Sequence, residues 1–494
     1  MVKTDLDTQI IVVGAGPVGL ALAGELRLGG AEVIVLEQRN SRITESRAST
    51  LHARTMEIFD SRGLLEAFGE LPNELVGHFG GIALDLGLPS RYPGQWKVPQ
   101  TRTEELLEER ALSLGADIRR GWKLLDMAKD GGSVQIVAGT PDGVRTLRAA
   151  YLVGCDGEES SVRRLTGSAF PGQPALRELL RADVTGLEIP NRRFERMERG
   201  LAIAARNKAG VTRVMVHEFG RDARSRTKKP DYQEVVTAWK LITGEDISEG
   251  KPLWVNSFGD ANRLLARYRD GRVLFAGDAA HQQMPSGGQA LNLGLQDAIN
   301  LGWKLALQVG RYAPKDLLDT YHSERHAVGK RVLANIRAQG SLLLGGTEVD
   351  PARTLLAEMI QADHNRTYLA GMISGLDIRY PVGDGAHPLL GAFLPDTTLT
   401  TNQGSTTTTA LLRGGRGLIV DFGGERTASL RWIGELWRDR VTTVTAHPNL
   451  DGPLQNTNAV LIRPDGHIAW LDVGSTEPAC AALRRWFGPP TPST

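Results

Sequence analysis

The hydrophobic positions near the start of the chain predict a strand, a turn, a helix and a second strand in succession. Residues 9–13 form a short apolar run rich in β-branched side chains, which favours a buried strand. Pro17 suits the first turn of a helix, and apolar residues then recur at helical spacing as far as Leu26. Residues 31–36 are apolar again and predict the second strand. The pattern therefore predicts a β-α-β unit of about thirty residues.

Similar patterns recur along the rest of the chain. Helical spacing is found at residues 52–68, 103–114 and 290–344. Strand-like runs lie at residues 134–137, 146–153 and 272–276. Between residues 180 and 260, short strand-like pieces are joined by polar loops, which predicts an antiparallel sheet in a second domain.

The C-terminal part of the chain predicts a third, smaller unit. The threonine-rich segment 397–409 is expected to be a loop or linker. Beyond it, apolar runs at 417–422 and 441–446 predict strands of a small α/β domain. Residues 459–471 predict a hairpin that turns at Pro464-Asp465-Gly466. A length of 494 residues agrees with about three domains.

Glycine is the unusual feature of the composition. The chain contains 57 glycines in 494 residues, a larger share than the ~7% of average proteins. Because no collagen-like period is present, this excess is expected at particular backbone positions. The formal net charge of +1 gives no reason to expect nucleic acid as a partner.

The cysteines and the apolar stretches bear on location. Cys155 and Cys480 are too few for a disulfide framework or a cysteine-rich zinc site, so no metal site is expected and a cytoplasmic location is favoured. The longest apolar stretch, residues 10–24, is short and interrupted by glycine and proline, so no membrane span is expected. Asp5 and Asp7 precede it where a signal peptide would be basic, so no targeting segment is expected.

A first glycine cluster follows the first predicted strand. Gly14, Gly16 and Gly19 form G-x-G-x-x-G, in which the glycines allow a tight turn, the approach of a pyrophosphate and close helix–strand packing. The helix that follows would offer free N–H groups to the phosphates. Glu37, at the end of the second strand, suits ribose hydroxyls and would repel a 2′-phosphate, which favours FAD or NAD over NADP. A glycine-rich turn without a ligand is the structural alternative.

Two further glycine clusters occur later in the chain. The second is Tyr151-Leu-Val-Gly-Cys-Asp-Gly157, followed by Arg163. The third runs from Gly271 through Gly277-Asp278-Ala-Ala-His to Pro285-Ser-Gly-Gly-Gln-Ala-Leu-Asn292. Neither is a second G-x-G-x-x-G, so a separate nicotinamide-binding domain of Rossmann type is not expected.

In this order, the three clusters resemble those of the single-component FAD-dependent aromatic hydroxylases, the group A flavoprotein monooxygenases. The resemblance runs from about Thr8 to the C-terminus. Further matching segments are Ser46-Arg47-Ala48, His52-Ala-Arg-Thr-Met-Glu-Ile-Phe59, Val98-Pro-Gln-Thr-Arg102, Tyr321-His-Ser-Glu-Arg325 and Arg463-Pro-Asp-Gly-His467. Together they are similar to the branch that hydroxylates aromatic polyketides and antibiotics.

The resemblance implies an α/β (α+β overall) fold. A Rossmann-like FAD-binding domain is expected from residues 1–175 and 260–395, with residues 75–100 contributing to a substrate domain. The substrate-binding domain, with its antiparallel sheet, is expected at residues 176–259. Residues 396–494 are expected to form a thioredoxin-like domain, which lacks Cys-x-x-Cys and would therefore be redox-inert.

The resemblance also implies the reaction. NADPH, or less favourably NADH, would reduce FAD, and O₂ would form the flavin C4a-hydroperoxide that hydroxylates an electron-rich ring. The expected partners are O₂ and a small polycyclic aromatic polyketide-type substrate, with a homodimer as an open option. No general base is assigned, because such a ring is activated largely by its own electrons.

The resemblance assigns cofactor contacts residue by residue. Asp278 is similar to the acid that binds the ribitol chain, and Gly287-Gly288 would begin a helix directed at the flavin ring. Arg47 matches an arginine beside the isoalloxazine and is the one candidate catalytic residue, with a surface loop position as its alternative. The full set of expected cofactor-binding residues is Gly14, Gly16, Pro17, Val18, Gly19, Glu37, Gln38, Arg39, Arg47, Gln100, Leu125, Asp156, Gly157, Asp278, Pro285, Gly287, Gly288, Gln289, Leu291 and Asn292.

Some residues near the expected flavin depart from the family pattern or have a structural alternative. Gln282, Gln283 and Met284 replace the more usual residues before Pro285, which puts transferred substrate contacts in doubt. His281 and His217 are polar candidates near the site, but a structural role is favoured for both. For Asp156 and Arg163, a strand-end turn with a capped helix is compatible with cofactor support. The apolar and aromatic residues of the second domain would suit a planar ligand, although core packing is favoured for most of them.

Three other functions remain open from the sequence. The same chemistry would serve to inactivate an antibiotic such as a rifamycin or a tetracycline. The scaffold would also suit a flavin-dependent reductase or dehydrogenase that inserts no oxygen. A non-catalytic FAD- or ligand-binding protein is the last alternative.

Overall fold

The N-terminal part of the chain forms most of a largely parallel sheet. In the computed structural model the described residues are 6–44, 48–224, 226, 228–423, 427–448, 453–454, 456–473 and 478–491. The strands of this sheet are β1 (Thr8–Val13), β2 (Val33–Glu37), β8 (Asp117–Arg120), β9 (Lys123–Lys129), β10 (Val134–Thr140), β11 (Gly143–Gly154), β19 (Arg269–Asp270) and β20 (Val273–Phe275). They are ordered β19-β20-β11-β1-β2-β8, with β10 and β9 extending from β11 as antiparallel neighbours. The predicted β-α-β unit is confirmed.

Long helices cover this sheet and extend away from it. They are α1 (Pro17–Leu28), α3 (Gln100–Ser113), α6 (Gln289–Val309) and α7 (Asp319–Leu344). A Cβ on Gly302 of α6 would lie 2.4 Å from Glu25 Cβ of α1, so these two helices pack at close range. The single helical region predicted at 290–344 is interrupted between α6 and α7, where Arg311 adopts a left-handed conformation with φ +64°.

Shorter elements surround the long helices. The helices and turns are α2 (Ala53–Asp60), α4 (Ser161–Thr166), α8 (Asp350–Ile360), α9 (Asp363–Ser374), η1 (Leu65–Phe68), η2 (Gly277–Ala279), η3 (Ser286–Gly288) and η4 (Thr347–Val349). The small sheets contain β3 (Thr50–His52), β4 (Asn73–Glu74), β5 (Val76–Phe79), β6 (Ile82–Asp85), β7 (Gln95–Lys97), β12 (Gly172–Gln173), β18 (Asn262–Leu264) and β21 (His281–Gln282). The one helix predicted at 52–68 is wrong as a continuous element, because α2 ends before Gly63, whose φ is +66°.

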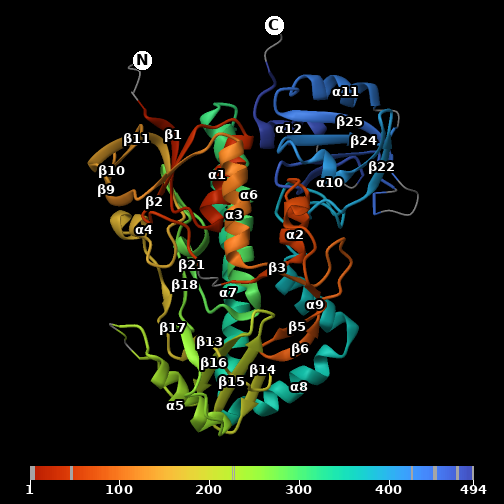
Figure 1. The fold of residues 1–494 in the computed structure, drawn as a ribbon. Coiled ribbons are helices and arrows are strands. Elements are labelled where there is room, and N and C mark those ends of the chain that lie inside the picture. Colours follow the sequence, from red (N-terminus) through yellow and green to blue (C-terminus); the bar gives the residue numbers. More distant parts are fainter. Residues whose placement is uncertain are drawn as a thin grey trace.

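The middle of the chain forms the expected antiparallel sheet. Its strands are β13 (Glu178–Thr185), β14 (Arg192–Met197), β15 (Gly200–Arg206), β16 (Val211–Glu218) and β17 (Lys251–Gly259), ordered β14-β15-β16-β13-β17. Helix α5 (Tyr232–Thr243) covers one face, where Trp239 is fully buried. Figure 1 shows this sheet at the opposite end of the molecule from the large sheet and the C-terminal sheet.

The C-terminal part is a compact α/β unit beside helix α2. Its elements are β22 (Thr398–Thr401), β23 (Gly404–Thr407), α10 (Thr408–Leu411), β24 (Gly417–Asp421), α11 (Thr427–Glu435), β25 (Val441–Pro448), β26 (Ala459–Ile462), β27 (Ile468–Leu471) and α12 (Ala479–Phe487). The linker predicted at 397–409 is wrong: the threonines form the β22–β23 hairpin, and β22 pairs with β25. Threonine is β-branched and suits an extended strand.

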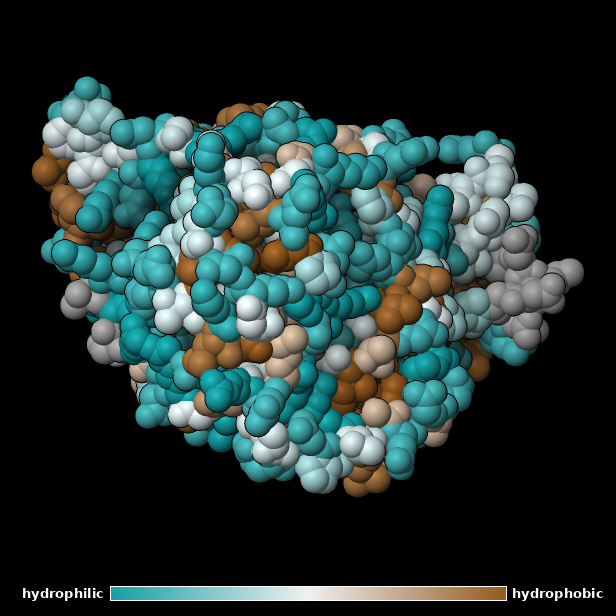
Figure 2. All heavy atoms as spheres, turned by 60° about the horizontal axis from the view of Figure 1, so that its bottom comes forward, coloured by the Kyte–Doolittle hydropathy of each residue, from teal (hydrophilic) through white to brown (hydrophobic). Residues whose placement is uncertain are grey.

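The whole architecture confirms the predicted fold class. A Rossmann-like sheet, an antiparallel middle sheet and a small C-terminal α/β sheet are joined through the long helices. Viewed from the middle-sheet end, the surface is mostly hydrophilic, and its apolar residues lie in small separate groups (Figure 2). Within the described ranges, no helix combines the length and the hydropathy that crossing a membrane requires.

Candidate functional site

The three glycines of the first turn differ in the space beside them: Gly16 has free space where a Cβ would lie, whereas Gly14 and Gly19 do not. Gly14 has φ +106°, and a Cβ there would lie 2.4 Å from the carbonyl oxygen of Cys155. A Cβ on Gly19 would lie 1.9 Å from the carbonyl oxygen of Gly14, so this glycine lets α1 pack against the turn. A Cβ on Gly16, in contrast, would meet no atom within 4 Å. No side chain caps the N-terminus of α1, so its N–H groups remain available to an anion beside Gly16.

The carboxylate of Glu37 is fixed beside this turn. Its Oε2 accepts a hydrogen bond from Ala15 N at 3.0 Å, and its Oε1 accepts one from Arg39 N at 2.9 Å. Gln38 and Arg39 follow it as exposed residues at the end of β2. The carboxylate therefore has a defined orientation at the position expected for a ribose.

The second cluster is built around a helix cap. Asp156 accepts hydrogen bonds from the Ser160 hydroxyl at 2.6 Å and from the backbone N–H groups of Ser161 and Val162 at the start of α4. Burial raises its pKa, although these hydrogen bonds act in the opposite direction. Arg163 donates to the carbonyl oxygen of Ala279 at 2.9 Å. Asp156 thus caps the N-terminus of α4, which is the structural role that the sequence allows for it. Arg163 connects the second cluster to the third.

The third cluster packs directly on the first. Gly277 has φ +64°, and its missing Cβ would lie 2.9 Å from Val18 Cγ2. A Cβ on Gly294 of α6 would lie 2.7 Å from the same methyl group. Asp278, which follows Gly277 in η2, has an exposed side chain. The turn thus presents this carboxylate next to α1, where the ribitol chain is expected.

A fully buried carboxylate that the sequence did not single out holds this turn. Asp297 of α6 accepts hydrogen bonds from Gly277 N at 3.2 Å and from His281 Nε2 at 2.8 Å. Arg325 of α7 donates its Nε to the other oxygen of Asp297 at 2.7 Å. Burial alone would raise the pKa of Asp297, but Arg325 and His281 keep it below the ordinary value. The only sequence signal is that Asp297 is the one acidic residue of α6.

The turn before α6 is the best candidate for contact with the flavin ring. Gly287 and Gly288 both have positive φ, +62° and +69°, and a Cβ on Gly288 would lie 3.0 Å from Thr50 Cβ. No side chain caps the N-terminus of α6. Gln289 is buried, and within the described residues neither its Oε1 nor its Nε2 has a hydrogen-bond partner. The turn therefore offers a helix N-terminus and an amide to a ligand.

Asn292 and His52 hold this turn from behind. Asn292 donates its Nδ2 to the carbonyl oxygens of Thr50 and Gly288, and its Oδ1 accepts from His52 N at 2.9 Å. His52 Nε2 donates to the carbonyl oxygen of Gly287 at 2.7 Å. Burial lowers the pKa of His52 to about 4, so the ring is neutral at pH 7. The amide of Asn292 thus positions the turn, and His52 supports it.

The remaining predicted cofactor residues differ in setting. Gln100 Oε1 accepts from Ala48 N at 3.2 Å, and its Nε2 donates to Glu104 at 2.8 Å. Leu125 is 46% exposed on β9, and Leu291 is half-buried on α6. Arg47 lies outside the described residues.

Large side chains pack on both faces of the middle sheet. Trp239 and Met197 pack in the core under α5, as favoured from the sequence. Four partly buried residues instead pack on the face that meets α7 and Met284, which lies just before the flavin turn: Phe194, Met215, Phe219 and Phe258.

Phe194 lies in a strained part of this face. Its φ is +52°, a conformation rare for a bulky residue, and its ring lies 4.0 Å from that of His78. Gln283 of the loop before the flavin turn has both amide atoms buried and without a partner among the described residues. The face beneath the flavin turn therefore combines apolar and aromatic side chains with buried Arg181, whose guanidinium lies 5.2 Å from the centre of the Phe258 ring.

The two histidine candidates have structural contacts. His217 lies between the carbonyl oxygens of Glu178 and Leu344, at 2.8 and 3.2 Å, and burial lowers its pKa. His281 is fully buried against Asp297. The structural interpretation of both residues is therefore the one that their contacts support.

Taken together, the open Gly16, the oriented Glu37, the exposed Asp278 and the uncapped α6 fit the FAD that the motifs predict. Within the described residues, no cluster of histidine, cysteine and acidic side chains is arranged to hold a metal ion.

Comparison with known proteins finds two matching family models and several relatives that align over nearly the whole chain. Residues 7–336 match the family described as FAD binding domain, and residues 387–490 match the one described as aromatic-ring hydroxylase, C-terminal. The chain is 39% identical to the 12-dehydrotetracycline 5-monooxygenase/anhydrotetracycline 6-monooxygenase of Streptomyces rimosus, over 98% of this chain and 99% of that protein. It is 41% identical to the rifampicin monooxygenase of Streptomyces venezuelae, with 98% and 99% covered. Among solved structures, CabE, an aromatic hydroxylase from angucycline biosynthesis, superposes with a TM-score of 0.95 at 49% identity, covering 98% of this chain and all of that one.

Proposed function

The chain belongs to the FAD-dependent aromatic-ring hydroxylases, and on that premise we propose that it hydroxylates a polycyclic aromatic polyketide-type substrate in antibiotic or secondary-metabolite biosynthesis. As a member of this family it is a flavin-dependent monooxygenase. The proposed reductant is NADPH and the proposed oxidant is O₂. One oxygen atom would enter the ring as a hydroxyl group, and the other would leave as water with the two electrons from NADPH.

One observation carries the substrate class. The face of the middle sheet below the flavin turn is lined by partly buried Phe194, Met215, Phe219 and Phe258. Aromatic and thioether side chains form flat, polarizable surfaces that suit fused rings. Gln283 and Gln289, with buried amide atoms lacking partners among the described residues, would bind the substrate's or the cofactor's polar substituents.

The chain's own residues have separate tasks in this proposal. When bound, FAD supplies the redox chemistry that activates O₂. The backbone at Gly16 and the N-terminus of α1 would hold its pyrophosphate, Glu37 its ribose and Asp278 its ribitol. The N-terminus of α6, after Gly288, would favour negative charge on the reduced ring through its dipole.

The experiment is a turnover assay with isotope tracing. The purified protein is expected to carry FAD and to oxidise NADPH faster when a suitable polycyclic phenol is added. Under ¹⁸O₂ the product is expected to gain one labelled oxygen atom. An unlabelled product would indicate a reductase or dehydrogenase instead, and the absence of ligand-stimulated oxidation across a panel of angucycline, anthracycline and tetracycline-type phenols would contradict the proposal.

A second function uses the same chemistry for resistance. It is favoured by the 41% identity to a rifampicin monooxygenase. If it holds, expression in a sensitive host protects growth against a rifamycin or a tetracycline. Unchanged growth inhibition by both drug classes, with active enzyme in the cells, would leave the biosynthetic role.

A further inference from the structure

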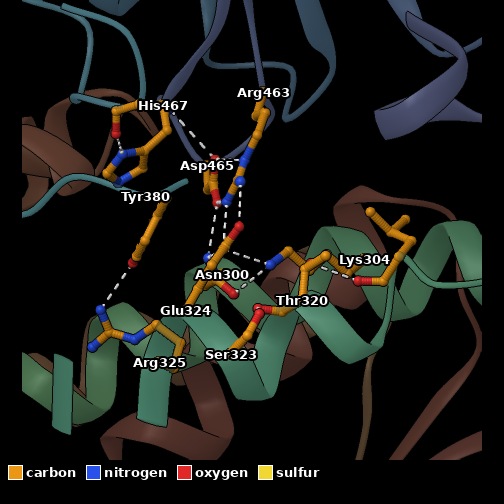
Figure 3. A network of polar contacts seen from close by, with 12 residues as sticks. Asn300, Lys304, Thr320, Ser323, Glu324, Arg325, Tyr380, Arg463, Asp465 and His467 are labelled. Carbon is orange, nitrogen blue, oxygen red and sulfur yellow. Dashed lines mark hydrogen bonds and ion pairs between the residues drawn. The ribbon is translucent and has the colours of Figure 1, made fainter. Parts of the chain in front are cut away.

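Two neighbouring residues of α7 connect the C-terminal unit with the cofactor turn. Glu324 and Arg325 are both fully or almost fully buried, and their side chains leave the helix toward different partners (Figure 3). Glu324 contacts the turn between β26 and β27, whereas Arg325 contacts α6 and Tyr380. Two consecutive residues of α7 therefore contact the β26–β27 turn on one side and α6 on the other.

The contact to the C-terminal unit is a buried network of four charges. Arg463 donates to both oxygens of Glu324, at 2.6 and 2.9 Å, and its Nε donates to Asp465 at 3.0 Å. Lys304 of α6 donates to Glu324 at 2.7 Å, and Asn300 bridges Glu324 and Asp465 at 2.7 and 3.2 Å. Burial alone would raise the pKa of Glu324, but Arg463 and Lys304 lower it far below its ordinary value. The two acids and two bases balance without any charge left over.

The contact to the cofactor turn runs through Arg325. Its guanidinium donates to Asp297 at 2.7 Å, to the carbonyl oxygen of Leu293 at 3.0 Å and to the Tyr380 hydroxyl at 2.9 Å. Asp297 in turn accepts from the backbone N–H of Gly277, directly before Asp278. A path thus leads from Arg463 to the turn that presents Asp278, through buried polar contacts on either side and the α7 backbone between Glu324 and Arg325.

The side chains along this path are tightly packed and have little room to move. The cavity beside Asn300, Tyr380 and Asp465 has a volume of about 10 Å³, which is room for no more than one water molecule. Buried ion pairs add little stability compared with apolar side chains of the same shape, and their best-attested use is to specify one arrangement of elements. A displaced C-terminal turn would leave Glu324 and Lys304 buried without Arg463.

We propose that the β26–β27 turn of the C-terminal unit is a positioning element for the cofactor, acting through Glu324, Arg325 and Asp297 on the Gly277–Asp278 turn. Arg325 and Asp297 are positioning residues in this proposal, because neither presents an exposed side chain to the expected ligand. The inference rests on FAD binding, a property of the family, and not on the hydroxylation of any particular substrate. It gives the redox-inert C-terminal unit a task in cofactor retention.

The test compares two charge-balanced double variants of the full chain. Arg463→Met with Glu324→Gln removes the link to α7 and leaves Lys304 opposite Asp465. Arg62→Met with Glu25→Gln is the matched control: Arg62 is also buried and donates to Glu25 and to Pro464 O of the same turn, but its hydrogen bonds do not reach Glu324 or Arg325 of α7.

The readouts are the Kd for FAD, from fluorescence titration of apoprotein, and the visible circular dichroism of bound flavin. Both are measured where far-ultraviolet circular dichroism shows the variants folded, and no substrate is needed. The first double variant is expected to raise the Kd at least about tenfold, the loss expected for one charge-assisted hydrogen bond, and to change the flavin spectrum. The control is expected to stay within about twofold of wild type.

Equal shifts in both double variants would show a general loss of stability and would overturn the proposal, as would a wild-type Kd in the first. A third variant, Arg325→Lys, keeps the charge beside Asp297 but cannot make all three guanidinium contacts. It is expected to give a smaller rise in Kd than Arg325→Met, with a changed spectrum. If the first double variant does not fold, a wild-type Kd and spectrum in Arg325→Lys and Arg325→Met overturns the proposal. Because hydroxylation is not measured, a failed substrate assignment leaves this result intact.

Discussion

Gly16→Ala is expected to weaken FAD binding without lowering the stability of the fold. Gly16 has φ −76° and ψ 179°, which alanine adopts without strain, and its Cβ would meet no protein atom within 4 Å. In the apoprotein, Gly16→Ala is therefore expected to be neutral or to raise the free energy of unfolding by ~0.4–1 kcal/mol, since alanine restricts the unfolded chain. The methyl group would occupy the space at the N-terminus of α1 where the pyrophosphate is proposed to bind.

The expected cost appears only in FAD binding. Moving the pyrophosphate away from the α1 N–H groups would forfeit hydrogen bonds to a charged group, worth ~1.5–3 kcal/mol. The Kd for FAD is therefore expected to rise by about 10- to 150-fold.

Gly19→Ala serves as the contrasting variant. Its Cβ would lie 1.9 Å from the carbonyl oxygen of Gly14, so α1 must move away from the turn. It is expected to lower the free energy of unfolding of the apoprotein by ~1–3 kcal/mol. Urea unfolding of the apoproteins and fluorescence titration with FAD measure both quantities. Wild-type FAD affinity in Gly16→Ala would refute the placement of the pyrophosphate, and a destabilised Gly16→Ala apoprotein would refute the reasoning from open space.

Three further outcomes are expected. Because the pKa of His52 is about 4 in the fold and 6.5 in the unfolded chain, the unfolded chain binds the proton first, and stability falls as the pH is lowered through this range. His52→Gln should therefore reduce the loss between pH 7.5 and pH 5 by about 2 kcal/mol in urea unfolding, and an unchanged pH dependence would contradict the buried neutral ring. Gly302→Ala should lower the urea midpoint of unfolding. Overpacking against Glu25 is expected to cost ~1–3 kcal/mol of stability, which is more than the ~1 kcal/mol that alanine gains in helix propensity. A raised midpoint would show that α1 and α6 move apart without cost. A thiol reagent should label Cys480, which is exposed, and spare Cys155, whose pKa is raised by burial, until the chain is denatured; rapid labelling of both thiols in the folded protein would contradict this burial.

Local patterns predicted the parts of the fold that depend on neighbouring residues. The run before Gly14, the proline at the start of α1 and the apolar residues of β2 each act over a few positions, and the strands and helix form as predicted. The glycine positions were also visible, since G-x-G-x-x-G has a geometric meaning in the strand–helix context. The polarity of residues 397–409 predicts a loop or linker, but the β-branched shape of threonine favours the β22–β23 hairpin that the segment contains.

The supporting residues behind the site could not be found in this way. Asp297 and Arg325 lie on different helices, and only the packing of α6 against α7 brings their side chains to 2.7 Å. His52 likewise supports Gly287 from a short strand far away in sequence. Periodicity indicates which face of a helix is buried, but it does not indicate which buried polar residue faces which partner.

The pairing of the first sheet has a consequence for how the protein is made. Ile10 of β1 pairs with Val33 and with Tyr151, and Leu152 of β11 pairs with Val273 of β20. During synthesis at ~5–20 residues per second, the ribosome needs roughly 15–50 s to pass from β1 to β20. Throughout that time the nascent chain holds an unfinished sheet with apolar strands exposed along an open edge, a template for association with other chains. Chaperone capacity during this interval should therefore influence the yield of folded protein in a heterologous host.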